Sequence, residues 1–197
     1  KTLSKASIES VLDLLLILPR KYKRRDRWFK VDKSLLPRAV TIEVSIKKHV
    51  YPKNRRSPLR ILAETYGCPL IIILFSFNKA QINNYYPPGA NVVISGDLTL
   101  DGSKLTMVHP DYSVKSDQIF KIPQIEPIYP SVIGLGNKFL HKTVCNILSN
   151  FKSTKEWYPP KFVQVKNWPS FLKALSLIHM PKDNKDLSCI MKARERL

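Results

Sequence analysis

Five segments between residues 39 and 112 carry the hydrophobic pattern of β-strands. Each is rich in β-branched or aromatic residues, and each is bounded by Pro, Gly or Asn, which interrupt strands. The predicted strands are VTIEVSIKKHV (40–50), LRILAETY (59–66), LIIILFSF (70–77), NVVISGDLTL (91–100) and KLTMV (104–108). The connection between the last two begins with Asp101-Gly102, a dipeptide that strongly favours a hairpin turn.

The segment between the third and fourth strands predicts a short helix. It reads NKAQINNYYPPG (78–89), which is long enough for one helical turn before Pro-Pro-Gly ends it. Five strands with a short helical insert between the third and fourth follow the order of the OB-fold, a partly open barrel that often binds oligonucleotides on one face and through its hairpin loops. The sequence therefore predicts a mainly β fold, a five-stranded OB-fold barrel with helices on its N- and C-terminal flanks.

The flanking segments have helical patterns. Ser10 and Asp13 have the spacing of a capping box, so we expect a helix over 11–18 that Pro19 ends. The three prolines of 122–130 predict an extended connector, and apolar residues at helical spacing predict helices over 137–149 and 170–178, with a helical tail from Leu187. We divide the chain into an N-terminal helix and basic segment (1–38), the barrel (39–117), and a connector with helices (118–197).

The chain is strongly basic, and the excess is uneven. The formal net charge is +18, of which 1–38 carry +7, 39–112 carry +3 and 113–197 carry +8. Within the barrel the bases gather in a run without an acid between Glu43 and Glu64. Its members are Lys47, Lys48, Lys53, Arg55, Arg56 and Arg60. Such a field attracts phosphates; the alternative is a solvated surface that keeps the protein soluble.

A second basic segment precedes the barrel. Between Lys21 and Arg27 the chain carries five Lys and Arg residues and one acid, Asp26. We expect either a solvated charged turn or a phosphate contact through Arg24 and Arg25, with Tyr22 beside the cations.

Aromatic side chains in the barrel could stack on bases. Tyr51 lies in the basic first hairpin loop, and Tyr85 and Tyr86 precede the Pro-Pro-Gly turn. Strand alternation places Phe75 and Phe77 on one face, and we expect Phe75 in the core. For Phe77, at the strand exit beside Asn78 and Lys79, both core packing and stacking stay open.

Several chemistries are not indicated. The sequence has no G-x-x-x-x-G-K-[ST] for nucleotide phosphates, and 134–138 read as a turn and helix start that could still offer N–H groups to a phosphate. His141 and Cys145 could share a helix face, but no second pair suggests a metal site. His109 ends the last strand and is read as a structural hydrogen-bonding residue, with a general base as the alternative. We do not expect the chain to be an enzyme on its own.

Cysteine use and hydropathy suggest a cytoplasmic setting. Cys68, Cys145 and Cys189 are odd in number and far apart, so neither a disulfide framework nor a zinc ribbon is indicated. No stretch approaches the roughly 18 apolar residues that a membrane span needs, and 11–18 lacks a signal-peptide cleavage site. The chain starts without Met, so we expect a piece of a longer protein.

Six stretches, in order along the chain, resemble motifs of the RecG family of ATP-dependent DNA helicases. They are LLLILPRKYKRRDR (14–27), LFSFNKAQ (74–81), MVHPDY (107–112), EPIYPSVIGLGNKFL (126–140), LKALSLIHMPKD (172–183) and KARERL (192–197). The resemblance implies the N-terminal wedge region, an OB-barrel that binds branched DNA such as stalled forks and Holliday junctions and separates strands at the branch point.

The resemblance also implies site residues and partners. Phe77 matches the aromatic that stacks on the parted base pair, whereas Gln81 stands where some members carry a second aromatic ring. Helicase motor domains would follow in cis and hold ATP and Mg²⁺, with no cofactor in this chain, and a bacterial, cytoplasmic monomer is expected. The candidate DNA-binding residues are Phe77, Asn78, Lys79, Tyr51, Lys53, Arg55, Arg56, Arg24, Arg25 and His109. A stand-alone OB protein for single-stranded DNA or RNA, and a protein-interaction module, are the alternatives.

Overall fold

The structure is a computed structural model, and it describes residues 8–54, 57–131, 135–151, 155–182 and 184–197. Two compact units account for the described residues. The first unit combines the N-terminal segment up to Lys23 with 125–197, and the second runs over Arg24–Gln124. The N-terminal helix therefore belongs with the C-terminal helices, and the barrel forms a unit of its own.

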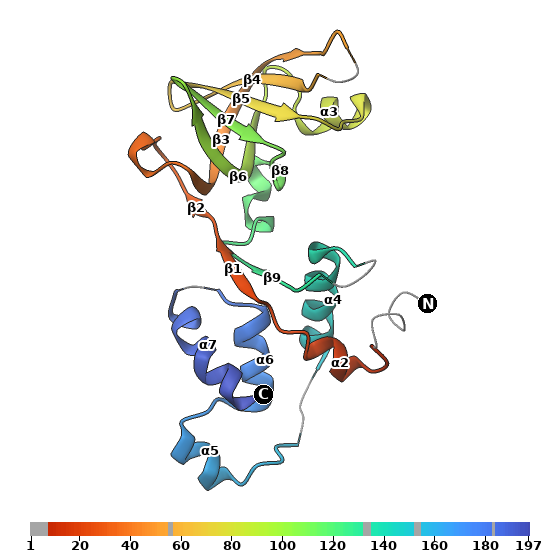
Figure 1. Cartoon of the computed structure of the whole chain (residues 1–197), viewed down its shortest axis with the longest axis vertical. Helices are drawn as coiled ribbons and strands as arrows, with labels where there is room; N and C mark the ends of the chain where they lie inside the picture. The colour runs from red at the N-terminus through yellow and green to blue at the C-terminus, as the bar shows by residue number, and fades with distance from the viewer. Residues whose placement is uncertain (1–7, 55–56, 132–134, 152–154, 183) are drawn as a thin grey trace. The chain divides into compact units, whose positions relative to one another are not determined.

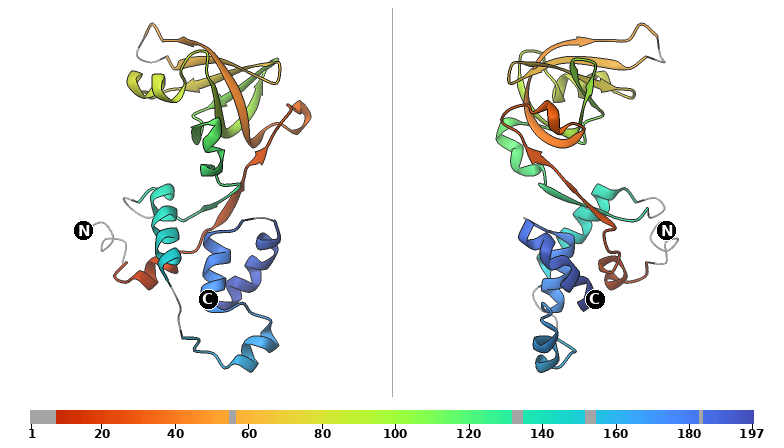
Figure 2. Two further views of the ribbon diagram at one scale, coloured as in Figure 1. Left: turned by 180° about the vertical axis from the view of Figure 1, so that it is seen from behind. Right: turned by 60° about the vertical axis from the view of Figure 1, so that its left-hand side comes forward.

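The second unit is a closed barrel of five strands (Figure 1). They are β3 (Arg38–Val50), β4 (Leu59–Thr65), β5 (Cys68–Leu74), β6 (Asn91–Asp101) and β7 (Lys104–Val108). The hydrogen-bonded order is β3-β4-β5-β7-β6, and β6 pairs again with β3 to close the ring. All neighbours are antiparallel except β5 and β7, which are parallel. The predicted OB-fold barrel is thus confirmed, and the views of Figure 2 follow the curve of β3 around it.

Turn chemistry sets the two tight hairpins of the barrel. Thr65 pairs with Cys68, so β4 and β5 are joined by Tyr66-Gly67, whose φ angles are 46° and 77°. Positive φ at both positions is the type I′ geometry that matches the twist of the strands. Asp101 pairs with Lys104 across Gly102 at φ 59°, as the Asp-Gly dipeptide predicts.

The core of the barrel is built from the inward positions of its strands. Val40, Ile42, Val44 and Ile46 of β3 are buried, and so are alternate residues of β4 and β5. The predicted insert is α3 (Lys79–Tyr85), whose Ile82 packs into the same core. After β7 the chain adds β8 (Tyr112–Lys115) on β6 and the 3-10 turn η2 (Ser116–Lys121).

The basic segment before the barrel is not a turn, because two short strands form there. β1 (Lys21–Arg24) pairs with β9 (Ile125–Ile128), and β2 (Asp26–Arg27) runs parallel to the start of β3. The predicted extended connector thus contains a hydrogen-bonded strand. The prediction missed β1, because its partner lies about a hundred residues further along the chain. A short 3-10 turn, η1 (Lys33–Leu35), precedes β3.

The first unit is mostly helical. Ser10 and Asp13 form the predicted capping box of α2 (Val11–Leu15), but the helix ends at Leu15, three residues before the predicted end at Leu18. The predicted helices are α4 (Asn137–Asn150), α6 (Phe171–His179) and α7 (Asn184–Arg196). α5 (Pro160–Lys166) was not predicted.

His179 is a buried link in the first unit. Its Nε2 lies 2.8 Å from the Leu15 carbonyl and its Nδ1 2.9 Å from the Tyr129 hydroxyl. Because a carbonyl can only accept, Nε2 carries the proton and Nδ1 accepts from the Tyr129 hydroxyl. His179 is therefore a neutral ring with both nitrogens hydrogen-bonded. Burial lowers the pKa of His179 to about 4 from its ordinary 6.5 and also lowers that of His141, which contacts the His179 carbonyl.

These pKa shifts predict that the first unit loses stability in mild acid. The unfolded chain binds a proton at His179 near pH 6.5 and the folded chain does so near pH 4. The contribution of neutral His179 to the free energy of unfolding is therefore complete above pH 6.5. It falls by about 1.4 kcal/mol per pH unit as the pH drops from 6.5 to 4. Amide hydrogen exchange at pH 7.5 and 5 should show α6 amides losing protection while barrel amides do not. His179→Gln should remove most of this difference; an equal loss in wild type and variant would contradict the assignment.

Candidate nucleic-acid interface

Aromatic and cationic side chains gather where β3 and β5 leave the barrel. Tyr51 is 39% exposed, and the centre of its ring lies 6.2 Å from that of Phe77 and 6.0 Å from that of the His49 ring, which it meets edge-on. Lys79 Nζ lies 5.4 Å from the centre of the Tyr51 ring. We call these four residues the aromatic corner. It brings together three of the predicted site residues and one, His49, that the sequence did not single out.

The aromatic corner is held by the barrel and by α3. Phe77 is half-buried and packs against the barrel core. Asn78 is the N-cap of α3, where its Oδ1 accepts from the Ala80 N–H at 2.9 Å, so its carbonyl oxygen has a structural role. His49 Nε2 lies 2.7 Å from the Tyr86 carbonyl, and burial raises the pKa of Tyr86.

Phe75 is on the outer surface, so its predicted place in the core is wrong. Leu74 is buried and β5 ends there, while Phe75 is 63% exposed. The ring stacks on His109 at 5.8 Å, and the Phe75 N–H donates to His109 Nε2 at 3.0 Å. His109 has φ 45°, and its hydrogen bond fits the structural alternative for this residue.

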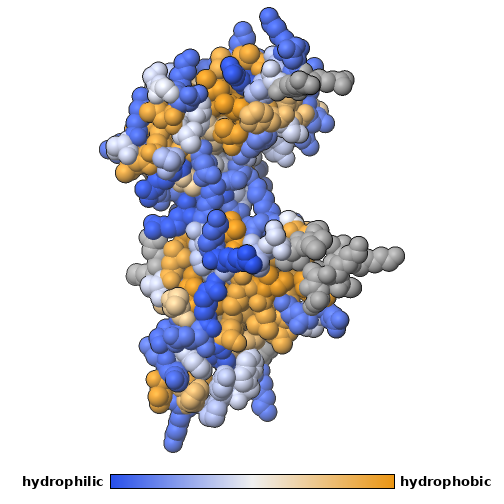
Figure 3. Space-filling view, in the orientation of Figure 1, coloured by the Kyte–Doolittle hydropathy of each residue, from blue (hydrophilic) through white to orange (hydrophobic). Residues whose placement is uncertain are grey.

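The outer face of β4 and β5 is apolar with a basic border. One cross-strand row runs Val50, Arg60, Ile73, Val108, and the next contains Lys48, Leu62 and Ile71. Leu62, Val50 and Val108 are exposed, and Figure 3 shows hydrophobic residues over this part of the barrel. This strand face is where OB-folds commonly bind oligonucleotides.

The cations of the acid-free run between Glu43 and Glu64 differ in their surroundings, because one is ion-paired and others are exposed. Lys47 sits at a bulge of β3 and forms an ion pair with Glu64 at 3.3 Å. Lys48, Lys53 and Arg60 are exposed. Arg55 and Arg56 lie outside the described residues.

Arg24 and Arg25 have opposite environments. The Arg25 side chain is 2% exposed, and its Nη1 lies 2.8 Å from Asp111 Oδ2 and 3.3 Å from the Ser95 hydroxyl. The guanidinium also lies 5.0 Å from the Tyr112 ring. Arg24 is exposed. The geometry gives Arg25 a structural role, and its predicted contact with DNA is not supported.

The candidate metal pair on α4 and the helix start before it show no arrangement of side chains that would bind a ligand among the described residues. His141 is engaged with the His179 carbonyl, and no group of three or more metal-binding side chains lies together among the described residues. Gly136 is the N-cap of α4 without a side-chain cap. In the described part of the chain no helix is long and apolar enough to cross a membrane.

The closed barrel, with aromatic and basic side chains at its strand exits, defines a protein of the OB class. The family described as the RecG wedge domain matches residues 1–151. The chain therefore belongs to the RecG wedge-domain family.

Curated relatives agree along almost the whole chain. ATP-dependent DNA helicase RecG of Escherichia coli O127:H6 (strain E2348/69 / EPEC) is 26% identical over 193 residues, which cover 94% of this chain and 27% of the relative. RecG of Thermotoga maritima (strain ATCC 43589 / DSM 3109 / JCM 10099 / NBRC 100826 / MSB8) is 27% identical over 206 residues, 100% of this chain and 25% of the relative. The chain spans about a quarter of the length of these relatives.

A solved structure agrees with the fold. The structure of RecG bound to a three-way DNA junction matches with a TM-score of 0.72 and 24% identity, covering 99% of this chain and 27% of that chain. The likeness supports the barrel together with its helical flanks.

The contrast between the two arginines predicts separable effects. Asp111→Ala leaves the buried Arg25 cation without its carboxylate, and we expect it to destabilise the barrel by about 3 kcal/mol. Arg24→Ala removes an exposed cation and should change stability by less than about 0.5 kcal/mol while weakening DNA binding. Urea melts and DNA titrations of both variants check this; an Arg24→Ala variant that melts like Asp111→Ala would refute the division.

Proposed function

We propose that this chain is the DNA-branch-binding wedge of a RecG-type helicase. The observation that carries the proposal is the aromatic corner, in which the Phe77 ring lies beside the Tyr51 ring and the Lys79 cation lies over Tyr51. Stacking on bases and attraction of phosphates are the two interactions that bind unpaired strands. Family membership and the three-way DNA junction bound by the solved relative support the same reading.

The proposed mechanism places strand separation at Phe77. Its ring is held against the barrel core, so it can replace the stacking partner that a terminal base pair loses at a branch. Lys79 lies over the Tyr51 ring, and the exposed cations Lys53 and Lys48 are two and three residues from Tyr51 along the chain. These three cations would contact the phosphates of the parted strands. The apolar outer face with Phe75 offers further surface to unpaired bases.

The parent protein is proposed to be an ATP-dependent DNA helicase of bacteria, acting in the cytoplasm as a monomer on forks and Holliday junctions during recombination and repair. ATP and Mg²⁺ would be bound by motor domains in cis, because this chain has no Walker A sequence. This chain by itself should bind DNA without hydrolysing ATP.

Phe77→Leu tests the stacking role. Leucine keeps apolar packing against the core, so stability should fall by less than about 1.5 kcal/mol. Loss of the ring should weaken fork binding by about 1–3 kcal/mol and leave blunt-duplex binding unchanged. Fluorescence-anisotropy titrations with a fork, a single strand and a duplex of the same sequence give the three affinities.

Phe77→Tyr, which keeps the ring, is the matched control and should retain fork preference. Wild-type affinity equal for the fork and the isolated single strand would favour the stand-alone single-strand binder. A Phe77→Leu variant with unchanged fork preference would exclude the role assigned to this ring.

The salt dependence of binding tests the cations. Lys53→Ala and Lys79→Ala should each reduce the slope of log affinity against log salt by about 0.7–0.9. Lys47→Ala, which removes a cation already paired with Glu64, is the control and should change the slope less. Equal slopes for all four proteins would mean that these lysines do not contact phosphates.

A further inference from the structure

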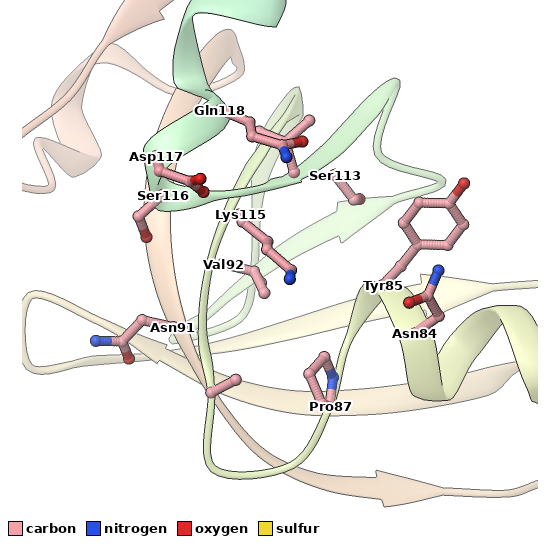
Figure 4. A pocket seen from close by; sticks show the side chains of 12 residues that line it. Asn84, Tyr85, Pro87, Asn91, Val92, Ser113, Lys115, Ser116, Asp117 and Gln118 are labelled. Atoms are coloured by element: carbon pink, nitrogen blue, oxygen red, sulfur yellow. The ribbon is translucent and has the colours of Figure 1, made fainter.

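A cavity of about 420 Å³ lies in the barrel unit among α3, β6, β8 and η2. Its volume falls within the roughly 300–1,000 Å³ of small-molecule sites. Val92 and Pro87 contribute apolar surface, and a ring, three amides, an ammonium and a carboxylate surround it. These polar groups belong to Tyr85, Asn84, Asn91, Gln118, Lys115 and Asp117 (Figure 4).

Most of these polar side chains have no partner in the part of the chain that the structure describes. Within the described residues, Asn84, Tyr85, Lys115 and Asp117 make no side-chain hydrogen bond or ion pair, and the Tyr85 side chain is 50% exposed. Figure 4 shows Asn84 and Tyr85 on one side of the cavity, Asp117 on the opposite side, and Lys115 between them. A stacking ring, amides that both donate and accept, and one cation suit a nucleotide.

The cavity is connected to the aromatic corner by rigid structure. α3 begins two residues after Phe77 and ends at Tyr85, and seven helical residues span about 10 Å. A second connection runs through His49, which contacts both the Tyr51 ring and the Tyr86 carbonyl. A hydrogen bond between the Tyr86 hydroxyl and the Ser113 hydroxyl links the end of α3 to β8.

We infer that this cavity binds one unpaired nucleotide of a parted DNA strand, with the base against Tyr85 and the phosphate at Lys115. The inference rests on the proposed function for the source of that strand. The carboxylate of Asp117 disfavours a phosphate on its own side and can accept from a base amino group. Stacked nucleotides are about 3.4 Å apart along a strand, so the roughly 10 Å length of α3 corresponds to about three nucleotide positions. We therefore expect the bound nucleotide about three positions from the base stacked on Phe77.

An abasic scan locates the nucleotide. Forks carrying one abasic position, placed one to six nucleotides from the branch in either unpaired arm, are titrated with the full chain. Loss of one stacked base should weaken binding by about 5- to 150-fold at one position, about three nucleotides from the branch in one arm. In Tyr85→Ala the same abasic position should have no effect, whereas Tyr85→Phe should keep the wild-type profile.

A second measurement does not depend on fork recognition. A five-nucleotide single strand titrated into the labelled full chain should shift the side-chain amide signals of Asn84 and Gln118 in NMR spectra, and Lys115→Ala should weaken this binding. Lys33→Ala removes an exposed cation of the same unit and should have no effect. Thermal melts of each variant confirm that it is folded.

The outcomes separate the two proposals. Fork preference with no shift at Asn84 and Gln118, or an abasic profile unchanged by Tyr85→Ala, overturns the cavity assignment and leaves the wedge function intact. Shifts that depend on Lys115, in a protein that binds fork and duplex alike, support the cavity and overturn the wedge function.

Discussion

The barrel depends on β3 pairing along both of its edges. The strand bonds to β6 through its first part and to β4 through its second, with Ser45 in both registers and a bulge at Lys47. Closure of this kind leaves no unpaired edge within the ring and buries the inward residues of β3 completely. It also fixes where β3 ends, so that Tyr51 emerges at the same end of the barrel as Phe77, and the aromatic corner follows from that register.

The strands were predictable because their composition is distinctive. Which alternate residues of each strand face the core was not always predictable. In LIIILFSF both faces of the strand are apolar, so alternation alone cannot say which residues enter the core. Register decides it, since Leu59 faces Leu74 and this leaves Phe75 outside. Strands β1 and β2 escaped prediction for a related reason. Their basic residues resemble a loop, and the partners that make them strands lie far along the chain or in β3.

The candidate site was likewise predictable residue by residue, although its grouping was not. Tyr51, Phe77 and Lys79 each stood out from local sequence, whereas His49 joined them through tertiary contact. Two neighbouring arginines show most clearly what local sequence cannot predict. Arg24 and Arg25 are indistinguishable in sequence, yet an acid 86 residues away holds Arg25 inside the structure. A charged side chain is buried only when it has such a partner, and the local sequence pattern does not indicate a partner that lies far along the chain.

Partial burial is what the proposed role asks of Phe77. A fully exposed ring would have to be ordered when a base stacks on it, and that ordering costs conformational entropy. A fully buried ring would offer no face to a base at all. Phe77 lies between these limits, since the barrel core supports it and Tyr51 lies beside it. Phe75 is ordered in a different way. Its exposed ring stacks on the His109 ring, and its backbone N–H donates to that same ring. Both rings are therefore ordered within the protein itself, which would lower the entropic cost of the proposed stacking.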